Sequence, residues 1–204
     1  MLTYPNDSDT VVVVLHEIYG VNQHMKNVCE RLSETGYDVV CPDLLGRDEP
    51  YNYDQEEIAY KNFMNMGFMQ VADTARSTVK QLRRTYRTVY VVGYSVGATT
   101  AWLCGTEPGL VDAFVAYYGS RIRDYLDKQP KCPSLLLFPK QETSFNVDEL
   151  ISKLRVQDNA DVRKCDGLHG FADPQNKYYS EVASRQAFDD TICFFSNISK
   201  SLSD

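Results

Sequence analysis

Short apolar runs alternate along the chain with segments in which apolar residues recur every three or four positions. Residues 11–15 form an uninterrupted apolar run, which is typical of a strand buried on both faces. Residues 23–35 and 73–85 show helical spacing instead. Five further runs predict strands at 38–41, 89–93, 113–117, 134–138 and 161–165. About six strands alternating with helices predict a single α/β domain over residues 1–204, with a mostly parallel sheet and helices on both faces.

Two more helices are predicted in the C-terminal half. Asn146 followed by Glu149 is a typical N-cap pair and opens a helix over 147–154. A last helix over 182–202 repeats apolar residues along one stripe, so it should pack on the sheet. The polar segment 47–55, with one proline and two tyrosines, is predicted to be a surface excursion.

Composition narrows the function classes. The chain is 43% hydrophobic and 24% charged, as in soluble globular proteins, and its net charge of −7 with no long basic run argues against nucleic acid as a partner. The apolar stretch near the N-terminus is too short for a membrane span or signal peptide. We therefore expect a cytoplasmic monomer or small homo-oligomer. Six scattered cysteines predict free buried thiols, and we expect no metal or cofactor.

The segment Gly93-Tyr94-Ser95-Val96-Gly97 has the G-x-S-x-G spacing of a nucleophile elbow. It lies between the predicted strand 89–93 and a helix-like segment over 98–104. Strand, turn and helix together would place the Ser95 hydroxyl above the carboxyl edge of the sheet, where ligands bind in open α/β folds. The alternative is a tight connection that carries no chemistry. The context favours Ser95 as a nucleophile.

A serine nucleophile needs a general base that is held by a third group. The chain order in this kind of fold is serine, acid, histidine, and His169 is the only histidine after Ser95. Glu142, four residues beyond the strand 134–138, is the preferred acid. Asp148 and Glu149 remain alternatives, although both fall inside a predicted helix.

Two backbone amides would complete the site as an oxyanion hole. One is that of Val96, directly after the nucleophile. The other is expected in the loop after the first central strand, at Ile18. In this interpretation His16 shapes the loop, and His24 stands at the start of a helix.

Five sequence blocks stand in order along the chain: HEIYGVNQHM (16–25), GYDVVCPDLLGR (36–47), VGYSVGA (92–98), AYYG (116–119) and LHGF (168–171). In order and spacing they resemble the dienelactone hydrolase family of α/β-hydrolases, from Val11 to the C-terminal helix. The resemblance implies an α/β-hydrolase fold and hydrolysis of a small ester or lactone by a nucleophile, histidine and acid triad. The N-terminal hairpin of longer relatives is expected to be absent.

The resemblance also exposes departures at the site. The family nucleophile is usually cysteine in G-Y-C-x-G, and the glutamate of H-E-x-x-G helps to set its ionisation; here Ser95 replaces the cysteine and Glu17 remains. Activation must then come from His169, while Glu17 shapes the oxyanion loop or contacts substrate. Glu142 stands where the family commonly has aspartate. The matching blocks place Tyr118 and Phe171 beside the pocket as further candidate substrate contacts.

The residues expected to recognise the charge of the substrate also differ from those of the family. Family members that act on anionic dienelactones bind the carboxylate with two arginines, one a helical turn before a tyrosine that matches Tyr60 and one four residues after the catalytic histidine. Those positions hold Glu56 and Asp173 here. Two carboxylates would repel an anion, so we expect a preference for neutral or cationic esters or lactones. The rival hypotheses are a non-catalytic binding module on the same fold and acyl transfer to an alcohol or amine.

Overall fold

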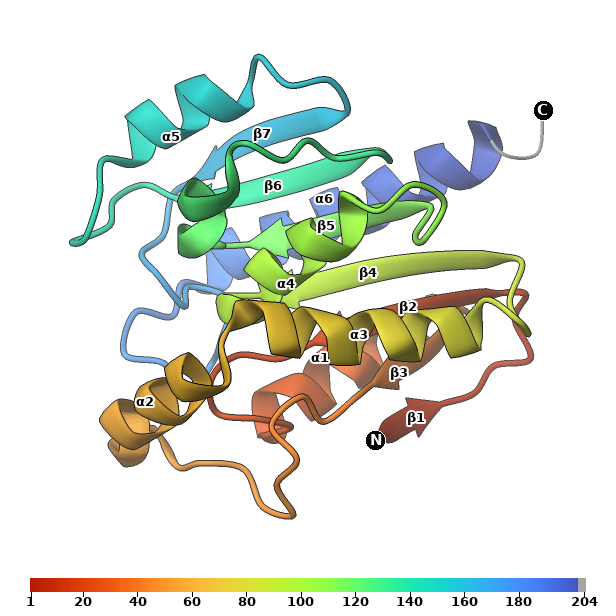
Figure 1. Cartoon of the computed structure of the whole chain (residues 1–204), viewed down its shortest axis with the longest axis horizontal. Coiled ribbons are helices and arrows are strands. Elements are labelled where there is room, and N and C mark those ends of the chain that lie inside the picture. Colours follow the sequence, from red (N-terminus) through yellow and green to blue (C-terminus); the bar gives the residue numbers. More distant parts are fainter. Residues whose placement is uncertain (202–204) are drawn as a thin grey trace.

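The computed structural model describes residues 1–201, and in these residues seven strands form one sheet in the order β1-β3-β2-β4-β5-β6-β7 (Figure 1). The strands are β1 (Leu2–Tyr4), β2 (Thr10–Leu15), β3 (Asp38–Cys41), β4 (Thr88–Tyr94), β5 (Ala113–Tyr117), β6 (Ser134–Pro139) and β7 (Ala160–Cys165). All neighbouring pairs are parallel except β1 and β3. The predicted α/β-hydrolase architecture is confirmed, and all six predicted strands are present.

Strand β1 was not predicted. It is only three residues long and pairs antiparallel with β3, where Thr3 lies opposite Val40. A segment this short carries too little alternation to indicate a strand, and its pairing depends on the position of β3 in the folded chain. The sheet therefore gains one edge strand beyond the six expected.

Helices cover both faces of the sheet (Figure 1). The side chains of Val11, Val13 and Leu15 pack on one side with α3 and α4, while those of Val12 and Val14 pack on the other with α1 and α6. Because both faces are covered, a continuous apolar strand is favoured over an alternating one. The helices are α1 (Gln23–Ser33), α2 (Glu56–Met66), α3 (Phe68–Leu82), α4 (Val96–Gly105), α5 (Val147–Leu154) and α6 (Glu181–Ser201).

Helix α4 has no solvent-facing side. All ten of its residues are buried between β4, β5 and α3. Small residues, among them Gly97, Ala98 and Ala101, let this helix approach the sheet closely. The segment after the elbow is thus held on every side by the core.

Several segments differ from their prediction in the structure, and α1 ends at Ser33 instead of 35. Helix α3 begins at Phe68 and ends at Leu82 instead of spanning 73–85, and α2 was not predicted. Segment 47–55 is only partly a surface excursion, because Tyr51 is buried and its amide donates to the Tyr19 carbonyl at 2.8 Å. Leu202, the predicted end of the last helix, lies outside the described residues.

The cysteines are free thiols, of which Cys29, Cys41, Cys104 and Cys132 are buried. The expectation of burial is wrong for Cys193, which is exposed on α6, and Cys165 is half-buried. Among residues 1–201 no three His, Cys, Asp or Glu side chains gather in a way that could hold a metal ion.

None of the described helices has the length and apolar character needed to cross a membrane.

Candidate active site

Ser95 lies at a sharp turn between β4 and α4. Its backbone adopts φ 54° and ψ −112°, in the left-handed half of conformational space that non-glycine residues rarely enter. A Cβ at Gly93 would lie 2.2 Å from the Gly97 carbonyl oxygen, and one at Gly97 would lie 2.2 Å from the Leu15 carbonyl oxygen. Both glycines are therefore required by close backbone packing, which is the reason for the G-x-S-x-G spacing.

Three side chains from separate loops form one hydrogen-bonded chain. The Ser95 Oγ is 3.0 Å from the Nε2 of His169, and the Nδ1 of His169 is 2.6 Å from the Oε1 of Glu142. Glu142 follows β6, and His169 follows β7, so the carboxyl ends of parallel strands bring them to the same sheet edge as the elbow. The distances are those that a catalytic triad would need between its hydroxyl, imidazole and carboxylate.

The other two candidate acids lie elsewhere. Asp148 is exposed on α5, and its Oδ1 is 2.6 Å from the Lys164 Nζ. Glu149 accepts a hydrogen bond from the Asn146 side chain at 3.3 Å as part of the helix cap. Neither carboxylate contacts His169, so of the three candidates the structure brings only Glu142 to the imidazole.

The protonation of His169 depends on opposing effects. Burial alone would lower its pKa, but the hydrogen bond and charge of Glu142, together with the charges of Glu17 and Glu56, outweigh burial and raise the pKa above its ordinary value. Glu142 therefore favours the protonated form of the imidazole. A glutamate in this position both orients the ring and stabilises its charge.

The two predicted oxyanion donors lie on the same cleft as the triad. Val96 is the first residue of α4, where an amide has no acceptor within its own helix. In the described part of the chain the Ile18 amide likewise donates to no protein acceptor. Ile18, Val96, Ser95, His169 and Glu142 all line one cleft with a volume of about 540 Å³. The cleft can hold a small substrate.

Comparison with known proteins agrees with this geometry. Residues 1–199 match the model of the dienelactone hydrolase family. The chain belongs to this family.

Three similar proteins show how closely the members are related. YczH, an uncharacterised protein of Bacillus subtilis (strain 168), is 43% identical over 174 residues, which cover 84% of this chain and 85% of YczH. A carboxymethylenebutenolidase of Pseudomonas putida is 31% identical over 137 residues, or 63% of this chain and 58% of that protein. A solved dienelactone hydrolase-like promiscuous phosphotriesterase from metagenomic libraries has a TM-score of 0.76 at 16% identity, covering 93% and 86% of the two chains. Family and relatives support a hydrolase.

Three of the residues expected to contact substrate are buried in this dienelactone hydrolase family member. Tyr118 and Phe171 are fully buried, and their rings pack on each other with centroids 5.3 Å apart. The Tyr118 ring also lies 5.0 Å from the His169 ring. Neither residue lines the cleft, so the expectation of substrate contact is wrong for both. Tyr118 packs beside the imidazole, and Phe171 packs on Tyr118.

Glu17 is also buried and does not line the cleft. Burial and the nearby charge of Asp173 raise the pKa of Glu17 to about 7, while His169 and the Tyr118 hydroxyl act in the opposite direction. Of the predicted substrate contacts, only Tyr60 lines the cleft, and it is 45% exposed there. The expectation that Glu17 contacts substrate therefore finds no support in its position.

Asp173 does not face the cleft, which corrects the expected charge repulsion. Its side chain is fully buried, accepts a hydrogen bond from the Tyr53 hydroxyl and lies 3.9 Å from the Nδ1 of His24. Asp173 thus ties the His169 loop to α1 and to the segment before α2. Of the two carboxylates expected to repel an anion, only Glu56 lines the cleft.

Three cations that sequence reasoning missed line the same cleft: Arg121, Arg123 and Lys177. The two arginines lie on the short 3-10 helix η2 (Ser120–Tyr125), directly after β5. The Arg121 Nε lies 2.9 Å from the Asp124 carboxylate. The Arg123 guanidinium donates to the Ser120 carbonyl and lies 3.9 Å from the same carboxylate. The signal was available, because charged residues directly after the carboxyl end of a parallel strand lie at the ligand edge.

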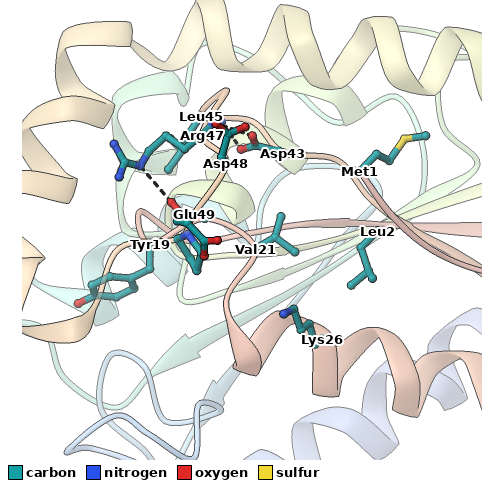
Figure 2. Close-up of a pocket in the computed structure, with 12 residues that line it drawn as sticks. Met1, Leu2, Tyr19, Val21, Lys26, Asp43, Leu45, Arg47, Asp48 and Glu49 are labelled. Carbon is teal, nitrogen blue, oxygen red and sulfur yellow. Dashed lines mark hydrogen bonds between the residues drawn. The ribbon is translucent and has the colours of Figure 1, made fainter.

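A second cavity of about 500 Å³ lies beside the oxyanion loop (Figure 2). The loop after β3 forms one wall, with Asp43, Arg47 and Glu49, and the Arg47 Nε donates to the Glu49 carbonyl at 3.2 Å. Tyr19 lines both this cavity and the catalytic cleft. Ser95, His169 and Glu142 do not line the second cavity.

Proposed function

We propose that this protein hydrolyses small carboxylic esters or lactones through an acyl intermediate on Ser95. The observation that carries the proposal is the chain of hydrogen bonds from Ser95 through His169 to Glu142 along the cleft. It joins a nucleophile, a base and an orienting acid in the geometry that acyl transfer requires.

The reaction follows from these positions. The His169 Nε2 accepts the hydroxyl proton of Ser95 as the Oγ attacks the substrate carbonyl carbon. The oxygen that becomes negative accepts hydrogen bonds from the Ile18 and Val96 amides. When the C–O bond to the leaving group breaks, His169 donates its proton to the departing alkoxide. Water then attacks the acyl-serine by the same sequence and releases the acid, which restores the Ser95 hydroxyl.

The substitution of serine for the usual family cysteine suits this arrangement. A serine hydroxyl is not ionised near neutral pH, so it depends on a base within hydrogen-bond distance. His169 is at that distance from Ser95, and the charge of Glu142 stabilises the imidazolium that forms. Glu17 has no part in proton transfer in this proposal.

The cleft has cations at other positions than the two arginines with which family members bind an anionic substrate. Arg121, Arg123 and Lys177 line it, and the carboxylates of the lining are Glu56 and the histidine-bound Glu142. Asp124 pairs with both arginines and offsets part of their charge. The Pseudomonas putida relative is named for a lactone that bears a carboxymethylene group. We therefore propose that the substrate carries an anionic group that lies toward η2, and not toward Glu56.

Neutralising the two arginines tests the substrate charge. We expect Arg121→Gln and Arg123→Gln each to raise KM for the p-nitrophenyl monoester of succinate about tenfold, because each removes one charge-assisted contact. The KM for p-nitrophenyl butyrate, which has no charge, should change less than about twofold because it never made that contact. Steady-state kinetics with both esters measure the difference.

Arg84→Gln is the matched control, since Arg84 follows the C-terminal end of α3, lines a different hollow and does not line the cleft. It should leave both KM values unchanged. Equal effects of the two η2 variants on the charged and neutral esters would contradict the assignment of this wall to an anion.

Covalent labelling tests the proposed chemistry itself. A fluorophosphonate probe should modify Ser95 in the wild-type protein, as located by peptide mass spectrometry, because an activated serine attacks phosphorus as it attacks a carbonyl. Ser144 also lines the cleft but has no histidine partner, so it should stay unmodified. Absence of labelling in the folded protein would instead favour a non-catalytic binding module.

A further inference from the structure

The buried imidazole of His16 bridges two loops beside the active site. His16 directly follows β2 and is 1% exposed. Its Nε2 is 2.9 Å from the Leu44 amide nitrogen, in the loop after β3, and its Nδ1 is 2.7 Å from the carbonyl oxygen of Glu17. Neither triad nor substrate binding uses this residue.

The two contacts determine which ring nitrogen carries the proton. The Leu44 amide can only donate, so the Nε2 that receives it must be unprotonated. The Nδ1 then bears the hydrogen and donates it to the Glu17 carbonyl. Burial lowers the pKa of His16, which keeps the ring neutral in this form.

The Glu17 carbonyl and the Ile18 amide belong to one peptide unit. In a planar trans peptide the C=O and N–H bonds point in opposite directions. The carbonyl is held on one side by His16 and by the Gly20 amide at 3.3 Å. The Ile18 amide is therefore turned to the other side, and Ile18 lines the cleft together with Ser95 and Val96.

The opposite oxyanion donor is fixed to the same piece of backbone. Gly97 packs so closely that a Cβ there would lie 2.2 Å from the Leu15 carbonyl oxygen and 2.6 Å from that of His16. The start of α4, with the Val96 amide, thus rests on the residues from which the Ile18 loop departs. The spacing of the two amides depends on how the short stretch from 16 to 18 is held.

We infer that His16 is a positioning residue of the oxyanion hole, which holds the Glu17–Ile18 peptide so that its amide meets the developing oxyanion. The inference rests on the proposed hydrolase function. A loosely held donor stabilises the transition state less than a preorganised one, and loss of one such donor lowers kcat by about 10²- to 10³-fold. Binding of the substrate before reaction needs no such donor, so KM should change little.

Two amide substitutions separate positioning from simple structural support. The side-chain nitrogen of asparagine can take the place of the Nδ1 and still donate to the Glu17 carbonyl, but it does not reach Leu44. The side-chain oxygen of glutamine can take the place of the Nε2 and accept from Leu44, but it leaves the Glu17 carbonyl without this donor. H16N and H16Q each lose one of the two hydrogen bonds of His16, so each variant is the control for the other.

The measurements are kcat and KM for p-nitrophenyl acetate, melting temperature, and affinity for phenylboronic acid, whose serine adduct places an oxygen at the oxyanion position. We expect H16Q to lower kcat and the boronate affinity about 100-fold with KM within about threefold of wild type. We expect H16N to stay within about tenfold of wild type at a similar melting temperature. Equal losses in both variants, losses that merely follow melting temperature, or no loss in either would overturn the inference.

Nuclear magnetic resonance of the wild-type protein supplies a test that needs no variant. The ring nitrogens of His16 should show a protonated Nδ1 and an unprotonated Nε2, and the Ile18 amide proton should move downfield when phenylboronic acid binds. A protonated Nε2, or an Ile18 amide that does not respond, would contradict the inference. Fluorophosphonate labelling of the wild type keeps the two proposals apart, because its failure removes the hydrolase function, whereas labelling with normal kinetics in H16Q removes only the role of His16.

Discussion

Ser95→Ala is expected to lower kcat for a small ester by about 10⁴- to 10⁶-fold, because the variant loses the atom that forms the acyl bond. The Oγ of Ser95 is the atom within hydrogen-bond distance of His169. The elbow backbone should be preserved, since the tight packing at this turn involves Gly93 and Gly97 and not the serine side chain. The expected result is a folded protein without turnover.

His169→Ala and the Ser95→Ala/His169→Ala double variant extend the test. Members of a triad act as one unit, so the double variant should be about as slow as either single variant and not slower by the product of their effects. Ser144→Ala is the control, because Ser144 shares the cleft without a histidine partner. Steady-state kinetics and circular dichroism measure the outcome. Turnover by Ser95→Ala near the wild-type rate would overturn the assignment of the nucleophile.

Glu142→Gln is expected to lower kcat by about 10²- to 10⁴-fold, since an amide can no longer hold the Nδ1–H form of His169 or stabilise the imidazolium. It should also move the acid side of the pH profile. Activity requires neutral His169, and Glu142 raises the pKa of that ring against the effect of burial. Without the carboxylate the pKa falls, so activity in the variant should persist to a lower pH than in the wild type.

The pH dependence of kcat/KM for both proteins checks this expectation, because it reports the pKa of the base in the free enzyme. Asp148→Asn and Glu149→Gln serve as controls, since both carboxylates lie on α5 and neither contacts His169. A larger loss in Asp148→Asn than in Glu142→Gln would show that the wrong acid has been chosen.

The central sheet could be predicted because its strands are buried on both faces and read as continuous apolar runs. Residues 11–15 and 89–93 are examples, and both fall within strands of the structure. Edge strand β1 and helix α2 escaped prediction for a physical reason. The first depends on pairing with β3, and the second has few buried positions, chiefly Ala59 and Phe63, so its apolar pattern is weak.

The candidate site likewise contains residues that could be predicted from the sequence and residues that could not. Ser95 and its flanking glycines form a local motif with a fixed spacing, and His169 follows from chain order, so both could be placed before any geometry was known. The surroundings of Asp173 and Tyr118 could not, because their burial depends on which loops pack over them. A matching position in a family does not show whether a side chain faces substrate or core. Arg121 and Arg123 were missed because their only signal is their position after β5, and they belong to no motif of fixed spacing.

Helix α4 begins directly after Ser95, and all ten of its residues are buried. A helix enclosed by β4, β5 and α3 cannot swing or tilt to fit a new substrate, so adaptation must occur at the rim, where Tyr60 on α2, Tyr178 and the η2 arginines line the cleft. The elbow and α4 are thus fixed by the core, while the residues at the rim of the cleft are free to change. A mutagenesis library aimed at new substrates should therefore sample the border residues and leave residues 93–105 untouched.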